Sequence, residues 1–173
     1  SALNARVSTS AGNPVHASLA AGILGFGERH GMAVEGAMKF FYENVKNKEI
    51  GLTIKEFKDK KIRIPGFGHK VFTDTDPRAV TLFSVAKKQK IFGEYSKLAL
   101  TVQKELNKIS TKPLPLNVDG ALAAILCDLA VDSKMGNTIF LIGRIQGLLA
   151  HIYEERTHDV GIRRLEENDI EYI

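Results

Sequence analysis

Three features of the 173-residue sequence predict an all-α fold. Apolar residues recur at helical spacing in several segments, and no alternating segment of useful length favours a strand. Glycine- and proline-containing turns separate these segments. The chain is 44% hydrophobic and 25% charged, which is the composition of a soluble globular protein that buries a core.

Apolar periodicity and capping signals place the helices along the chain. From Pro14, the residues Val15, Leu19 and Ile23 recur with Gly and Ala between them, as in a helix buried on most sides. Asp76-Pro77 marks another helix start, because Asp caps a helix N-terminus and Pro fits its first turn. The signals together predict helices over 14–25, 34–46, 53–60 with Thr53 as its cap, 77–90, 95–109, 118–131 and 138–153.

Residues 62–78 interrupt the helical pattern and are predicted to form a loop. The segment from Ile62 to Phe72 carries one proline and two glycines within four positions, at Pro65, Gly66 and Gly68. Glycine permits backbone conformations that other residues avoid, so this loop has a specified backbone path. Glycines beside His69 also suggest backbone N–H groups that are free to bind an anion.

Charge and cysteine content limit the class of protein. The net charge of +4 suggests nucleic acid, but no basic run interleaved with aromatic residues supports such binding. The basic excess over 55–63 and 87–90 fits either a solvated helix face or a site for a phosphate-bearing cofactor. The single cysteine, Cys127, lies in an apolar run and is predicted to be a buried structural thiol in a reducing, cytoplasmic compartment.

No segment resembles a membrane span or a signal peptide. A bilayer span needs roughly 20 consecutive apolar residues, and the chain has no such stretch. The first seven residues lack the basic and then apolar layout of a signal peptide. The chain does not begin with Met, which favours a fragment, and its polar tail from Arg156 is expected to pack on another surface.

Three titratable side chains stand where a structural protein would have little use for them. His30 follows Glu28-Arg29 at the junction of two apolar helices, His69 follows the glycine-rich loop, and Asp119 begins an apolar helix. Taken alone, His30 has a simpler alternative as a hydrogen-bonded histidine near a helix end, and Asp119 has one as an N-cap. A purely structural role is hardest to assign to His69, because glycines lie beside it. Together they form an acid–base set suited to removing a proton from a carbon next to a carbonyl.

Arginines complete this set with fixed donors for carboxylates. Arg78, Arg144 and Arg164 are the candidates, since a guanidinium binds a carboxylate through two parallel hydrogen bonds. Arg144 lies in the apolar segment from Ile139 to Ile145. We therefore expect it to be buried and to need an anionic partner from the protein or a substrate.

These motifs resemble the citrate synthase family. Pro65 to His69 followed by Asp76-Pro77-Arg78 is similar to the family signature. The family's catalytic aspartate motif is matched by 117–119, its first histidine motif by 30–31 and its late arginine-bearing helix by 143–147, while 8–12 also resembles the family near the start of the chain. Order and approximate spacing agree over essentially the whole chain.

The resemblance implies catalytic roles by position. Asp119 would be the base for the acetyl-CoA methyl group, and His30 would donate to the thioester oxygen. His69 would polarise the keto oxygen of oxaloacetate or the matching hydroxyl of citryl-CoA. No metal is implied.

The resemblance also implies binding roles. The substrate carboxylates would be held by Arg78, Arg144 and, from the partner subunit, Arg164, with Phe140 against the substrate. Coenzyme A would bind as acetyl-CoA or citryl-CoA, its adenine contacted by the backbone of Arg63, Ile64, Pro65, Gly66, Phe67 and Gly68.

The family fold has a large dimerising domain and a small domain that closes over the substrates. The matching segments are 1–33 and 121–173 for the large domain and 34–120 for the small one. The family's N-terminal helices, with a further substrate histidine, have no counterpart in this chain, which is expected to form a homodimer or a higher oligomer.

Several details resemble the citryl-CoA lyase module of ATP-citrate lyase more than an ordinary synthase. These are the segments 28–31, 116–120, 143–151 and 164–172. The predicted activity is therefore cleavage of citryl-CoA to acetyl-CoA and oxaloacetate. Condensation by a citrate synthase and a non-catalytic, CoA-binding or oligomerising member of the fold remain alternatives, whereas binding to nucleic acid or membrane is not expected.

Overall fold

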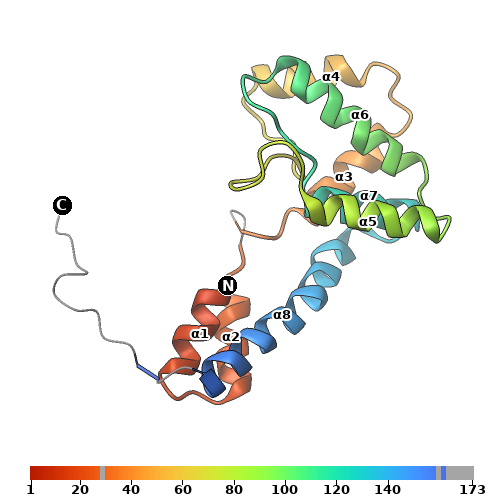
Figure 1. Cartoon of the computed structure of the whole chain (residues 1–173). Helices are drawn as coiled ribbons and strands as arrows, with labels where there is room; N and C mark the ends of the chain where they lie inside the picture. Colours follow the sequence, from red (N-terminus) through yellow and green to blue (C-terminus); the bar gives the residue numbers. More distant parts are fainter. Residues whose placement is uncertain (28–29, 159–160, 163–173) are drawn as a thin grey trace, which may run out of the picture. The chain divides into compact units, whose positions relative to one another are not determined.

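The computed structural model describes residues 1–27, 30–158 and 161–162. Within these ranges the chain is helical and contains no strand, which confirms the predicted all-α class (Figure 1). The elements in order are α1 (Ala2–Ser10), α2 (Val15–Leu24), α3 (Val34–Asn44), α4 (Ile50–Asp59), α5 (Pro77–Lys88), α6 (Glu94–Ile109), α7 (Val118–Asp128), the 3₁₀ turn η1 (Ser133–Met135) and α8 (Gly136–His158).

The chain divides into two compact units. Unit 1 comprises Ser1–His30 and Leu141–Ile173, and unit 2 comprises Gly31–Phe140. Helix α8 begins in unit 2 and continues into unit 1. The family resemblance places its domain boundaries after residues 33 and 120 instead, and those boundaries remain a prediction.

Helix α7 is the centre of unit 2. It is apolar on nearly all sides, and α3, α5 and α6 pack against it, with α4 against α6. The core is formed by fully buried side chains such as Phe41 and Met38 of α3 and Val102 of α6. A helix that is apolar all round needs such cover, because burying its side chains is what stabilises it.

In unit 1 the first two helices pack against each other and against the later part of α8. Ala5, Leu148 and Ile152 form its buried core, joined by partly buried residues of α2. Gly22 permits this packing, because an added Cβ would lie 3.0 Å from the Cβ of Ala5 and 3.2 Å from Leu148 Cδ1. Arg6 pairs with the buried Glu155 at 3.0 Å and also contacts Glu154.

The start of the third predicted helix was placed wrongly. Helix α4 begins at Ile50, with Glu49 at its N-cap position, so Thr53 lies inside the helix and is not the cap. Asn47 organises this start: its Oδ1 accepts from the N–H of Glu49 at 2.9 Å, and its Nδ2 donates to Thr53 Oγ1 at 2.9 Å. The threonine hydroxyl is therefore used by the preceding turn.

Helix α1 was not predicted. Its sequence, Ala2–Ser10, has a weak apolar pattern, and no side chain caps its start. Its stability comes from packing, since Ala5 and Thr9 are buried and the Thr9 hydroxyl donates to the carbonyl of Ala5 at 2.7 Å. Tertiary contacts commonly outweigh such local preferences.

No helix among the described residues is long and apolar enough to cross a membrane. The chain's cysteine, Cys127, is 2% exposed within α7, and its thiol lies 3.7 Å from the carbonyl of Met38. Burial raises the pKa of this thiol to about 12, although a hydrogen bond with Tyr42 acts in the opposite direction. The predicted structural role of the thiol agrees with this environment.

We therefore expect Cys127 to resist alkylation by iodoacetamide at about pH 8 in the folded protein, because the thiolate is the reactive form. Labelling followed by mass spectrometry should be at least about 100-fold slower than in denaturant, since it requires local opening. Comparable rates in the two conditions would show that the α3–α7 packing opens readily.

Candidate functional site

The glycine-rich loop is tied to the segment that precedes α7. Phe67 and Leu116 form an antiparallel bridge, and the Gly68 N–H donates to the carbonyl of Pro115 at 2.7 Å. Asn117 adds two bonds, from its N–H to Gly66 O at 3.0 Å and from Nδ2 to Gly68 O at 2.9 Å. This short pairing brings His69 and the start of α7 together from positions far apart in the sequence.

Two glycines allow the loop to reach the helix. Gly66 has a φ of +89°, and a Cβ there would lie 2.6 Å from the Cα of Gly120. A Cβ on Gly120 would lie 2.4 Å from the carbonyl oxygen of Gly66. Because both obstacles are backbone atoms that cannot rotate away, the close approach requires glycine at both positions.

Asn117 caps helix α7, so the N-cap alternative for Asp119 is wrong. The Asn117 side chain accepts from the N–H groups of Asp119 at 3.0 Å and Gly120 at 3.1 Å. Asp119 is the second residue of the helix and lies at the positive end of the helix dipole. Capping therefore does not explain the presence of an aspartate at this position.

Backbone donors fix the ring of His69. The N–H groups of Val71 and Phe72 both donate to Nδ1, each at 3.1 Å. The prediction that N–H groups around this loop are free is therefore wrong for these two residues and for Gly68. A neutral imidazole that accepts at Nδ1 carries its proton on Nε2, so His69 presents a donor there.

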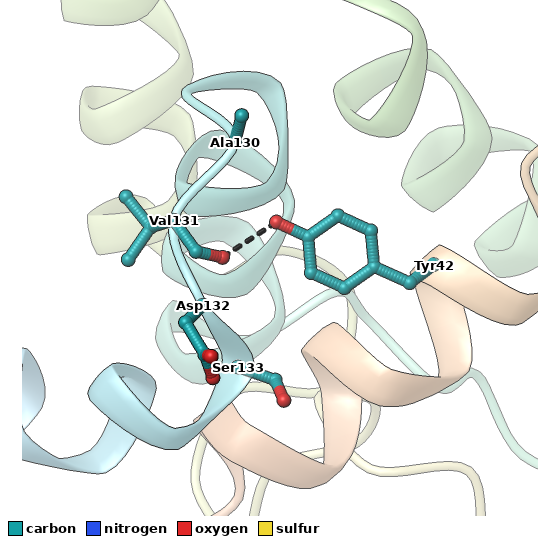
Figure 2. A pocket seen from close by; sticks show the side chains of 5 residues that line it. All are labelled: Tyr42, Ala130, Val131, Asp132 and Ser133. Atoms are coloured by element: carbon teal, nitrogen blue, oxygen red, sulfur yellow. Dashed lines mark hydrogen bonds between the residues drawn. The ribbon is translucent and has the colours of Figure 1, made fainter.

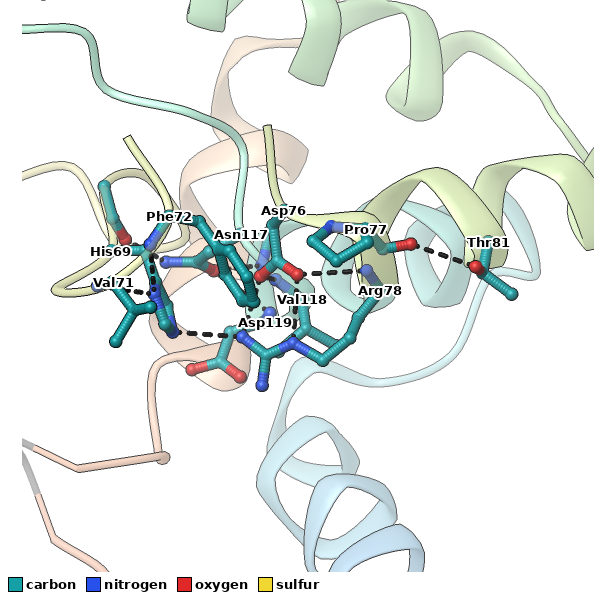
Figure 3. A network of polar contacts seen from close by, with 12 residues as sticks. His69, Val71, Phe72, Asp76, Pro77, Arg78, Thr81, Asn117, Val118 and Asp119 are labelled. Carbon is teal, nitrogen blue, oxygen red and sulfur yellow. Dashed lines mark hydrogen bonds and ion pairs between the residues drawn. The ribbon is translucent and has the colours of Figure 1, made fainter. Parts of the chain in front are cut away.

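Arg78 aims a second donor at the same place. Its Nη2 lies 3.1 Å from Nε2 of His69 (Figure 3). Guanidinium nitrogens only donate, so in this tautomer two N–H groups face each other without an acceptor between them. An oxygen atom carrying negative charge would satisfy both, and carboxylate, alkoxide or polarised carbonyl oxygens have this character.

Asp76 fixes the Arg78 guanidinium from the opposite side. Its carboxylate, 1% exposed, accepts from Arg78 Nε at 2.9 Å and from Arg78 Nη2 at 2.8 Å. Burial acts to raise the pKa of Asp76, but hydrogen bonds from Arg78 and Val118 outweigh it and lower the pKa. The same pairing raises the pKa of Arg78, and the nearby charge of Asp119 acts in that direction too. The pairing therefore stabilises Asp76 as a carboxylate and Arg78 as a guanidinium cation.

Phe72 is a site residue that the sequence analysis did not identify. Its ring stacks on the His69 ring with centroids 4.7 Å apart, and the Arg78 guanidinium lies 5.5 Å from its centroid. One aromatic face therefore orders both donors, through stacking and a cation–π contact. The position three residues after His69 in an irregular loop gave no periodic signal that could have revealed it.

The other predicted histidine and one arginine meet in unit 1. His30 is exposed, stacks on Phe26 at 5.3 Å and has Nε2 3.1 Å from Ser1 Oγ. Arg144 lies 6.0 Å from the centroid of the same Phe26 ring. The expectation that Arg144 is buried is wrong: it is half-buried, and its guanidinium lies over the Phe26 ring.

The remaining predicted residues are placed as follows. Phe140 is half-buried and packs against the core of unit 2. Of the predicted cofactor-binding loop, Arg63 is exposed and Ile64 and Gly66 are buried, with Pro65, Phe67 and Gly68 intermediate. Glu28, Arg29 and Arg164 lie outside the described residues.

A separate hollow of about 490 Å³ in unit 2 is lined by none of the predicted site residues (Figure 2). It is formed by Tyr42 and the turn 130–133, and the Tyr42 hydroxyl donates to Val131 O at 2.6 Å. In the part of the chain that the structure describes, no group of three or more His, Cys, Asp or Glu side chains could hold a metal ion. The chemistry is thus best sought at the loop and the α7 start.

Residues 1–165 match the family model described as citrate synthase, C-terminal domain. The chain belongs to the citrate synthase family. Citrate synthase 2 of Bacillus subtilis is 34% identical over 94% of this chain and 44% of its own length. The probable ATP-citrate synthase of Dictyostelium discoideum is 31% identical over 98% of this chain and 30% of its own. The chain thus spans less than half the length of these curated relatives.

Solved structures extend the comparison. Citryl-CoA lyase from Hydrogenobacter thermophilus is 41% identical, with a TM-score of 0.87 over 99% of this chain and 68% of that one. ATP citrate lyase from Methanothrix soehngenii, in complex with citrate and coenzyme A, is 29% identical, with a TM-score of 0.80 over 99% of this chain and 30% of that one. Citrate synthase from Thermotoga maritima is 26% identical with a TM-score of 0.76, over 99% of this chain and 49% of that one. These matches confirm the resemblance to the family and to its lyases.

We expect Gly120→Ala to detach the loop from α7, since the new Cβ would meet the Gly66 carbonyl. The free energy of unfolding should fall by about 1–3 kcal/mol, as is usual for overpacking. Denaturant unfolding measures this change. Gly51→Ala in α4 is the matched control, because its Cβ would meet only a flexible Glu105 side chain at 3.4 Å. Equal stabilities of the two variants would contradict the required close approach.

Proposed function

We propose that this chain provides citryl-CoA lyase chemistry: cleavage of citryl-CoA to acetyl-CoA and oxaloacetate. The observation that carries the proposal is the pair of facing donors at His69 and Arg78, on a chain 41% identical to a citryl-CoA lyase. Two related structures hold coenzyme A with citrate, or (3S)-citryl-CoA. The acyl-CoA class of substrate is proposed by similarity to those proteins.

The cleaved bond joins the carbinol carbon of citryl-CoA to the methylene carbon next to its thioester. As that bond breaks, the hydroxyl passes its proton to a water molecule and becomes the keto group of oxaloacetate. The electron pair passes to the thioester as an enolate, whose methylene carbon then gains a proton. Charge therefore develops first on the alcohol oxygen and later on the thioester oxygen.

The His69–Arg78 donors suit the first of these oxygens. Nε2–H of His69 and Nη2–H of Arg78 would both donate to the alkoxide that becomes the keto oxygen. Asp76 and Phe72 hold them in place before the substrate arrives. Preorganised donors of this kind stabilise developing charge without the cost of reorientation.

Asp119 and His30 are proposed to serve the thioester end. Asp119, in its protonated form, would return a proton to the enolate carbon, and in the reverse direction its carboxylate would remove one. His30 would donate to the thioester oxygen. Arg144 and Arg164 would bind substrate carboxylates, Phe140 would lie against the substrate, and residues 63–68 would contact coenzyme A.

The same residues would also support condensation, which makes citrate synthase the second candidate. The 34% identity to citrate synthase 2 of Bacillus subtilis favours this reading. A synthase must hydrolyse the citryl-CoA thioester, whereas a lyase must leave the thioester intact. The two activities therefore release different products from one substrate.

The test is incubation of the full-length protein with citryl-CoA, with each product measured separately. A lyase yields oxaloacetate, seen as NADH consumption with malate dehydrogenase, and acetyl-CoA without free thiol. A synthase-type hydrolysis yields citrate and free coenzyme A, seen with a thiol reagent. Formation of thiol without oxaloacetate would replace the proposed lyase by a synthase. If neither product forms, the non-catalytic, CoA-binding alternative is favoured.

Asp119→Asn should lower this turnover by roughly 100-fold or more, because an amide cannot exchange a proton at carbon. The Kd for coenzyme A, measured by calorimetry, should barely change. Asp59→Asn, at the end of α4, is the control for loss of a negative charge. An Asp119→Asn enzyme with the wild-type rate would remove this residue from the mechanism.

We also propose that the protein is a homodimer. Several large apolar side chains of unit 1 are exposed, including Leu3, Leu24, Ile142 and Tyr153, at 71%, 84%, 57% and 68%. Monomers rarely expose such surface in contiguous patches. Light scattering at micromolar concentration should report twice the mass of one chain. The interface between the two copies should bury at least about 2,000 Å². A monomer would make Arg164 irrelevant to a neighbouring site.

A further inference from the structure

We propose that Asp76 is a positioning residue that fixes the anion-binding donors and the start of helix α7 in one arrangement. Its carboxylate is shared between Arg78, which faces His69, and Val118, the residue before Asp119. The setting of Arg78 relative to Asp119 therefore depends on one buried group. The kinetic consequences of this proposal rest on the proposed function, whereas the hydrogen bonds that carry it do not.

The two oxygens of Asp76 divide the task. Oδ1 accepts from the backbone N–H of Arg78 at 3.0 Å and from its Nε at 2.9 Å. Oδ2 accepts from Arg78 Nη2 at 2.8 Å and from the N–H of Val118 at 3.0 Å. The first oxygen therefore caps α5 and orients Arg78, while the second links Arg78 to α7 (Figure 3).

Four donors on a buried carboxylate exceed what capping α5 alone requires. A single backbone N–H would satisfy that role. The other three bonds come from a guanidinium and from a helix 42 residues later in the chain. A buried ionised group must be matched by such donors, so the Asp76 charge and these bonds maintain one another.

The arrangement couples the two ends of the proposed reaction. A shift of Arg78 toward a ligand oxygen would pull on Oδ2, and Oδ2 also holds the first amide of α7. Because Asp119 follows Val118 directly, its carboxylate would move with that amide. Displacements of about 1 Å at a catalytic group are enough to change rates roughly 100-fold.

Asp76→Asn in the full-length protein keeps the shape but turns an NH₂ group toward donors. We expect the Kd for oxaloacetate, by calorimetry, to rise about 10- to 100-fold and kcat to fall by a similar factor. The KM for citryl-CoA should rise as well, because Arg78 would no longer be held in place for the substrate oxygen. Asp74→Asn, an exposed aspartate in the same loop, is the matched control and should leave these values unchanged.

Val118→Pro tests the Asp76 bond to α7 separately from its bonds to Arg78. Val118 is the first residue of α7, where proline is well tolerated, and Asn117 before it is extended with ψ of 176°, which suits a residue preceding proline. The substitution removes the N–H from which Asp76 accepts and replaces the half-buried valine side chain by a ring. We expect kcat to fall about tenfold or more while the Kd for oxaloacetate stays within about twofold of wild type. A merely structural role would not produce this split.

Amide hydrogen exchange gives a readout that does not depend on turnover. The Val118 N–H should exchange at least about tenfold faster in Asp76→Asn than in wild type or Asp74→Asn. If the wild type neither cleaves nor forms citryl-CoA, the proposed function fails while this exchange test still stands. Unchanged exchange and unchanged kcat in Asp76→Asn would overturn the proposal. Should Asp76→Asn not fold, a wild-type kcat in Val118→Pro would overturn it.

Discussion

The close approach of two backbones, at Gly66 and Gly120, is the constraint on which the site depends. It lets the loop lie directly on the first turn of α7, where the Asn117 side chain fastens it. The all-α core of unit 2 matters to function mainly because α7, surrounded by α3, α5 and α6, provides a rigid base for this contact.

The contact between Arg78 and His69 places two hydrogen-bond donors opposite each other. Asp76 neutralises Arg78 from behind, yet Arg78 and the Nε2 proton of His69 still point at one another. The N–H groups of Val71 and Phe72 donate to Nδ1 and prevent the ring from turning this acceptor toward Arg78. A negatively charged oxygen placed between Arg78 and Nε2 of His69 would accept from both donors. Local geometry therefore indicates the charge of the ligand before any relative is considered.

Particular residues show what the sequence could and could not predict. The Asp76-Pro77 start of α5 follows from capping chemistry and was predicted correctly, and the loop containing Gly66 and Gly68 was recognised from its composition. Each of the helices α4, α5 and α7 is followed, two residues after its end, by a left-handed residue that is not glycine: Lys61, Lys90 and Ala130. The predicted ends of these helices were therefore one to three residues too late. Phe72 was missed because an aromatic side chain in an irregular loop leaves no periodic signal. Phe26 continues the apolar spacing of Val15, Leu19 and Ile23 but was not assigned to a site.

The position of Asp119 explains why the other donors are needed. Asp119 lies at the N-terminus of α7 and near the Arg78 guanidinium, whose pKa its charge helps to raise. A weak base removes a proton from carbon only if the enolate is strongly stabilised, since each unit of pKa mismatch costs about 1.4 kcal/mol. In the proposed cleavage direction the same stabilisation is needed, because the enolate must persist until a proton reaches its carbon.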